Sequence, residues 1–255
     1  MRMNQEMIDF LEQKIIEYNQ ISFIEKDPIS IPHRFDIKQD IEIAGFFSAH
    51  FSWGNRTTII KKSLELMQLM DDAPFDFIQN HQTLDLKRFE HFKHRTFQFD
   101  DLCYFIHFLK FHYSKYHSLE QAYGGNQVMT MKERLIYFHH YFFSLEHLAR
   151  TRKHISTPAK NAACKRQNMF LRWMVRNDKT GVDFGIWNQI KMSDLHLPLD
   201  VHVANVSYRL GILNDKKSSW TNTEKVTQFF QEIAPDDPAK FDFALFSLGV
   251  EEGIR

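Results

Sequence analysis

The chain has few of the residues that shape disulfide-rich, metal-rich or turn-rich proteins. Two cysteines among 255 residues, Cys103 and Cys164, exclude a disulfide framework, a four-cysteine iron–sulfur cluster and a cysteine-rich zinc site. With only nine glycines and seven prolines, the composition disfavours β architectures with many turns and favours long helices.

Net charge and long apolar runs are also missing. The 32 Lys and Arg residues balance the 32 Asp and Glu residues, so an anionic partner has to meet a local basic patch. No stretch approaches the ~18 consecutive apolar residues of a membrane span. Residues 1–9 carry acids and lack the apolar core of a signal peptide. We therefore expect a reduced, cytoplasmic protein with no membrane partner.

What the chain does have is ample apolar material at helical spacing. Hydrophobic residues make up 43% of the sequence, and 25 residues are Phe, which is enough for a sizeable core. No segment alternates with period two long enough to predict a strand. The sequence therefore predicts an all-α fold, with Asp100 and Asp101 capping the 102–116 helix. Helices are expected over residues 7–18, 41–51, 57–70, 75–79, 83–92, 102–116, 132–149 and 201–210.

One segment, residues 150–179, is strongly basic. It holds nine cations and a single acid, Asp178, together with apolar residues such as Phe170 and Trp173. Such a run is either a solvated helix face or a stripe that contacts phosphates. The cations are Arg150, Arg152, Lys153, Lys160, Lys165, Arg166, Arg172, Arg176 and Lys179.

The segment Leu197-Pro198-Leu199-Asp200-Val201-His202-Val203 continues to Arg209-Leu210-Gly211. It resembles the "hydrophobic-Asp-x-His-Val-x-Arg-Val-x-x-Arg-Leu-Gly" stretch of the helix–hairpin–helix DNA glycosylase superfamily, the endonuclease III type. The resemblance implies that Asp200 is the catalytic carboxylate beside the reacting sugar. Asn205 stands where that stretch often has a basic residue.

A second segment, Cys164-Lys165-Arg166-Gln167-Asn168, is similar to the "Gly-x-Lys-Thr-Ala-Asn" end of the hairpin in that superfamily. By this resemblance Lys165 matches the nucleophile of bifunctional glycosylase/lyases, and Asn168 the recurrent Asn. The hairpin glycines are missing from residues 158–163. Lys165 and Asp200 lie 35 residues apart, which makes residues 178–194 an insertion. Phosphate contacts are expected from Lys160, Arg166, Arg172 and His202.

A third segment, residues 44–56, resembles the early "Leu-Leu-Ser-x-Gln" helix, with His50 in place of Gln, and residues 241–249 resemble the last core helix. The base pocket is expected to include His50, Trp53 and Trp187. The resemblance implies one two-lobed helical domain over residues 1–255, with residues 41–150 as the central lobe. Residues 1–40 and 151–255 would form the lobe with the degenerate hairpin. The whole chain also resembles a bacterial family of conserved proteins without an assigned function.

The residues leave more than one function open. Asp200 either stabilises positive charge at the anomeric carbon or simply caps a helix. Lys165 either forms a Schiff base with a sugar or contacts phosphate. The hypotheses are a glycosylase that flips bases out of damaged duplex DNA, with or without lyase activity, and a catalytically silent nucleic-acid-binding module. A third is an RNA-directed or protein-interaction role. No cofactor is expected, and no metal, because the histidine pairs lack a third ligand.

Overall fold

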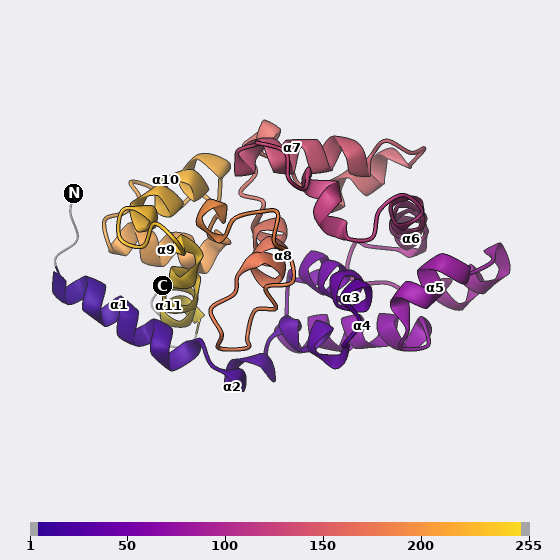
Figure 1. Ribbon diagram of the computed structural model, residues 1–255, viewed down its shortest axis with the longest axis horizontal. Helices are drawn as coiled ribbons and strands as arrows, with labels where there is room; N and C mark the ends of the chain where they lie inside the picture. The colour runs from indigo at the N-terminus through magenta and orange to yellow at the C-terminus, as the bar shows by residue number, and fades with distance from the viewer. Residues whose placement is uncertain (1–4, 251–255) are drawn as a thin grey trace. The chain divides into compact units, whose positions relative to one another are not determined.

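The computed structural model describes residues 5–250, and every regular element in this range is a helix (Figure 1). The described residues form eleven α-helices and eight short 3-10 helices, with no strand. The predicted all-α fold is therefore confirmed.

The chain packs into two compact units. Of the described residues, unit 1 contains 5–25, 130–132 and 157–250, and unit 2 contains 26–129 and 133–156. The predicted lobes placed residues 26–40 with the hairpin, whereas here they belong to unit 2. The reason is local packing: two 3-10 turns, η1 (Pro28–Ser30) and η2 (Pro32–Arg34), contact the first long helix of that unit.

Unit 2 is built around that helix, α3 (Lys38–Phe51), which is buried almost along its whole length. Phe46 of α3 packs against Phe105 and Phe142 in tilted ring pairs, with centroids 5.7 and 6.1 Å apart. Such aromatic pairs add to the burial that holds the unit together. The other helices of unit 2 are α4 (Arg56–Leu69), α5 (Pro74–Asn80), η3 (Thr83–Phe89), α6 (Phe99–Tyr113), η4 (Leu119–Tyr123), α7 (Met131–Phe142, inside the unit from residue 133) and η5 (Ala149–His154).

The start of α6 differs from the sequence-based prediction. The helix begins at Phe99, three residues earlier than expected, and Gln98 is its N-cap. Asp101 lies in the first turn, where its Oδ2 accepts from the backbone N–H of Gln98 at 3.0 Å. This reciprocal capping box satisfies N–H groups that the helix itself cannot.

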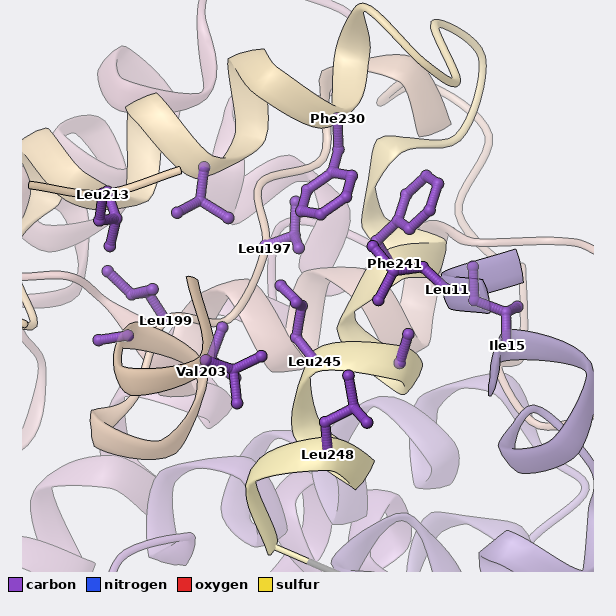
Figure 2. Packing of buried hydrophobic residues seen from close by; sticks show 14 of the residues in the cluster. Leu11, Ile15, Leu197, Leu199, Val203, Leu213, Phe230, Phe241, Leu245 and Leu248 are labelled. Atoms are coloured by element: carbon purple, nitrogen blue, oxygen red, sulfur yellow. The ribbon is translucent and has the colours of Figure 1, made fainter. Parts of the chain in front are cut away.

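Unit 1 buries the apolar faces of four helices in one cluster (Figure 2). The α1 helix contributes Leu11 and Ile15, and α11 contributes Leu245 and Leu248. The helices of this unit are α1 (Gln5–Tyr18), α2 (Ile21–Ile24), η6 (Pro158–Lys160), α8 (Lys165–Val175), η7 (Met192–Asp194), α9 (Val201–Arg209), α10 (Trp220–Gln231), η8 (Pro238–Lys240) and α11 (Phe241–Val250).

A glycine allows α11 to approach α9 closely. A Cβ atom at Gly249 would lie 2.9 Å from the Cβ of His202, closer than real side chains come. The absence of a side chain at this position therefore fixes the start of α9 against α11. Since Asp200 directly precedes α9, this contact also positions its carboxylate.

The long connection from α8 to α9 folds back on the helix that it leaves. The Phe184 N–H donates to the Trp173 carbonyl at 2.8 Å, and the Trp187 N–H donates to the Met174 carbonyl at 2.9 Å. The connection is thus anchored to the last turn of α8 by backbone bonds.

Candidate functional site

Asp200 is the N-cap of α9. Its Oδ1 accepts from the backbone N–H groups of His202, at 2.9 Å, and of Val203, at 3.0 Å. The side chain is partly buried. Both N–H groups would otherwise lack a partner, so Asp200 fixes the first turn of α9 whatever its chemical role.

The hairpin segment before α8 turns without glycine. Asn161 and Cys164 adopt left-handed backbone conformations, with φ of +54° and +52°. Asn tolerates this region better than most residues because its short polar side chain bonds locally. Here the Oδ1 of Asn161 accepts from the Thr221 N–H at 3.0 Å, and its carbonyl accepts from the Trp220 N–H at 3.0 Å. The hairpin is therefore tied to the start of α10.

One face of α8 carries a row of polar side chains. Lys165, Asn168 and Arg172 are three and four residues apart, so they lie on the same side of the helix. Lys165 is the first residue of α8 and is partly buried, whereas Asn168 and Arg172 are buried. The row therefore begins at the partly buried amine of Lys165 and ends at the buried guanidinium of Arg172.

The interior end of this row meets Asp242, in the first turn of α11. The Arg172 Nη1 donates to Asp242 Oδ2, and the Arg172 Nε donates to Asp183 Oδ1 at 3.3 Å. Burial, opposed by the charge of Arg172, raises the pKa of Asp242 to about 6. Asp200 raises this pKa further, and Lys165 lowers it. The charges of Asp200 and Lys165 thus act in opposite directions on the pKa of Asp242.

A second arginine extends the buried network. Arg176 pairs with Asp178 at 2.7 Å, with Asp183 at 3.1 Å and with Asp237 at 2.9 Å. Arg172 is 4% exposed and Arg176 is 2% exposed. The sequence analysis expected Arg172 to contact phosphate. In the structure its side chain is buried, and its charge is neutralised by Asp183 and Asp242. The acidic partners of Arg172, Asp183 and Asp242, lie outside residues 150–179, so the composition of that basic segment did not predict these ion pairs.

The other expected phosphate contacts lie nearer the surface of unit 1. Lys160 in η6 and His202 in α9 are exposed. Arg166 is partly buried, and burial lowers its pKa to about 10. These residues stay predicted nucleic-acid contacts.

Two of the three expected base-pocket residues are core side chains. His50 is 2% exposed, its Nδ1 donates to the Phe46 carbonyl at 2.7 Å, and its ring lies 4.3 Å from that of Phe46. Trp187 is 2% exposed and packs edge-on against Phe170 at 5.3 Å. Both rings are therefore packed among core side chains, which leaves their assignment to a base pocket without support. Trp53, in unit 2, is partly buried and meets the ring of His94 at 4.7 Å.

A pocket of about 600 Å³ opens beside the end of α1 and contains none of the predicted site residues. It is lined by Ile15, Ile16, Asn19, Gln20, Ile21, Ser22 and Thr180. Among residues 5–250, no three His, Cys, Asp or Glu side chains gather as metal ligands. Within the same range, no helix has both the length and the apolar character needed to cross a membrane.

The family profile described as "Protein of unknown function (DUF2400)" matches residues 27–251, which is most of the sequence. The chain belongs to the DUF2400 family. No curated protein and no solved structure matches it. The matched range of this DUF2400 protein includes Lys165, Asp200 and Asp242.

Sequence reasoning missed Asp242 as a member of the site. A signal was nevertheless present, because Asp242 is the single charged residue in the mostly apolar stretch Phe241–Val250 of the DUF2400 protein. A lone carboxyl in a buried helix requires a partner, and here that partner is Arg172.

Proposed function

We propose that this DUF2400 protein is a DNA glycosylase-like enzyme that removes a damaged base after flipping it out of the duplex. The observation that supports the proposal is the packing around α11: α9, which Asp200 caps, contacts α11, and Arg172 of α8, the helix that Lys165 begins, pairs with Asp242 of α11. Lys165 and Asp200 lie 35 positions apart. Burial raises the pKa of the Asp242 carboxyl to about 6, and a perturbed carboxyl of this kind is common at functional sites.

Asp200 would act on the sugar. Cleavage of a glycosidic bond develops positive charge at the anomeric carbon, and a nearby carboxylate stabilises that charge. Asp200 is held rigidly, because its Oδ1 accepts two backbone N–H bonds. Only the transition state gains from this charge, so the residue would raise the rate rather than tighten binding of the ground state.

Lys165 would supply the lyase step. Its amine, when deprotonated, would attack the sugar C1′ and form a C–N bond while the bond to the base breaks and the base leaves with a proton. The Schiff base that follows is reducible by borohydride. Lys165 is suited to this by its place as the first residue of α8, where its side chain is only partly buried.

The test is borohydride trapping and base excision on a panel of damaged duplexes and abasic DNA. Asp200→Asn should keep the cap, because Asn caps helices about as well as Asp. Its melting temperature should therefore match the wild type, while excision falls by about 10²–10³-fold, as for loss of one electrostatic stabiliser. Lys165→Gln should abolish the trapped adduct, and Lys160→Gln, which removes an exposed hairpin lysine, should not.

Two results would contradict the proposal. An Asp200→Asn variant with wild-type excision of a verified substrate would remove the catalytic role of Asp200. If the wild-type protein binds damaged DNA but neither excises a base nor forms an adduct on the whole panel, the protein is a silent binding module, and Asp200 serves only as a helix cap.

A further inference from the structure

Three loops of unit 2 meet around the ring of Trp53. They are residues 52–55 after α3, residues 93–97 before α6, and the 3-10 helix η5. The Trp53 ring lies 4.7 Å from the ring of His94 in the second loop and 6.2 Å from that of His154 in the third. We call these three loops the Trp53 surface.

The buried carboxylate of Asp101 contacts residues of η5, which is part of the Trp53 surface. Asp101 in α6 is fully buried and accepts from the Thr151 Oγ1 at 2.9 Å. It also pairs with Arg150 at 3.0 Å, and the His154 Nε2 lies 3.2 Å from its Oδ2. Arg150 in turn donates to the Thr96 carbonyl at 3.1 Å. Asp101 therefore neutralises Arg150 and fixes η5 beside the second loop.

The outer side of the Trp53 surface is cationic. The three loops contain five Lys or Arg residues and no Asp or Glu: Lys93, Arg95, Arg150, Arg152 and Lys153. Four of these five side chains are exposed, the exception being Arg150. The acid that joins these loops, Asp101, is buried, and the exposed acids Glu90 and Asp100 lie in the flanking segments, so the loops themselves carry a net positive charge.

Arg95 covers the loop next to Trp53. Its backbone is in the left-handed region, with φ of +55°, an uncommon conformation for a residue with a side chain. Gly54 has φ of +107°, and a Cβ there would lie 2.3 Å from the Arg95 Nη1. Glycine at this position thus lets the guanidinium lie against the loop backbone. Strained backbone of this kind often accompanies a binding role.

We propose that the Trp53 surface binds a nucleic-acid strand, with its cations on the phosphates and the indole of Trp53 stacked on a base. Lys and Arg supply the sequence-independent attraction to phosphates. A partly exposed aromatic ring among such cations is the arrangement by which single strands or flipped bases are held. The inference takes its partner from the proposed function but concerns a different part of the chain from Asp200 and Lys165.

Binding of the full-length protein to labelled oligonucleotides, single-stranded and duplex, tests this by fluorescence anisotropy over a range of salt. Lys93→Glu combined with Lys153→Glu should weaken binding at least tenfold and lower the slope of log affinity against log salt by about two. The control is Lys115→Glu in the same unit. Lys115 is exposed and follows the far end of α6, about 20 Å along the helix axis from Asp101. It should change neither quantity.

The stacking role of Trp53 is tested by comparing the affinity for an oligonucleotide with the affinity for heparin, a polyanion that has no bases. Trp53→Leu should lower oligonucleotide affinity by about 5- to 100-fold, the range for loss of one stacked base, and leave heparin affinity unchanged. Trp53→Tyr should restore most of the oligonucleotide affinity, and melting temperatures check that each variant folds. If the Lys93/Lys153 variant binds like the wild type, the surface is not where nucleic acid binds. An equal loss for heparin and oligonucleotide in Trp53→Leu would refute the stacking role.

These outcomes are separable from those for the proposed function. Excision that persists after the Trp53 surface is altered, with unchanged DNA affinity, overturns this inference alone. DNA binding through the Trp53 surface by a protein that excises no base overturns the proposed function alone.

Discussion

Replacing Arg172 with Met separates a buried structural role from a phosphate contact. The change leaves two buried carboxyls, Asp183 and Asp242, without their shared partner, although Asp183 keeps Arg176 at 3.1 Å. Removing one partner of a buried ion pair costs about 3–5 kcal/mol. Because a domain is stable by only about 5–15 kcal/mol, we expect a large loss in the free energy of unfolding at neutral pH.

The loss should depend on pH in a definite direction. The folded-state pKa of Asp242 is about 6 with Arg172 present, above the ordinary value of 3.8, and losing the guanidinium raises it further. The folded chain then binds this proton more tightly than the unfolded chain, so stability falls as pH rises from 3.8 through the folded pKa. The deficit of Arg172→Met relative to wild type should therefore be larger at pH ~8 than at pH ~5.

Urea unfolding followed by circular dichroism at both pH values measures this. Lys160→Met removes an exposed cation of the same basic segment and should stay within about 0.5 kcal/mol of wild type. A phosphate contact at Arg172 predicts the opposite pattern, namely unchanged stability and a DNA salt slope lowered by about one. That pattern, or a deficit that grows toward acid pH, would refute the buried network.

Two further predictions concern single residues. Asn161→Ala puts a less tolerant residue at φ +54° and removes the acceptor for Thr221, so we expect a loss of about 1–2 kcal/mol in urea unfolding and a smaller loss for Asn161→Gly. His112 is buried, and burial lowers its pKa to about 4. The unfolded chain takes up this proton first, so stability should fall by up to about 3 kcal/mol as pH drops from 6.5 to 4, and His112→Gln should flatten that dependence.

The helices that the sequence predicted are those with long apolar faces. The α3 helix was expected within three residues of its observed start, because its buried positions are occupied by Phe, Ile and Ala, whereas α11 was expected from its resemblance to a known core helix. The α10 helix was missed. Its buried face includes Asn222, Thr223 and Thr227, polar side chains that interrupt the apolar repeat and have low helix propensity. Tertiary packing rather than local sequence specifies that helix.

The site was only partly predictable, for a related reason. Lys165 and Asp200 were chosen by resemblance to short motifs. The burial of Arg172 depends on acids 11 and 70 residues away, and no local pattern connects them. His50 and Trp187 show the same limitation, because residue type alone does not distinguish a ring in a base pocket from a ring in a core. The basic excess of residues 150–179 wrongly suggested that Arg172 faces solvent, because the acids that neutralise Arg172 lie outside that segment.

The path from α8 to α9 also bears on how such a chain can change in length. The connection leaves α8 and then bonds back to Trp173 and Met174 of that same helix. Its first part is therefore a loop that begins and ends at the last turn of α8. At its outer part, Gly181 is exposed, and a Cβ there would meet no atom within 4 Å. Residues inserted at Gly181 would lengthen a loop whose ends stay fixed. We therefore expect an insertion at Gly181 to lengthen the path from Lys165 to Asp200 while the two side chains keep their places.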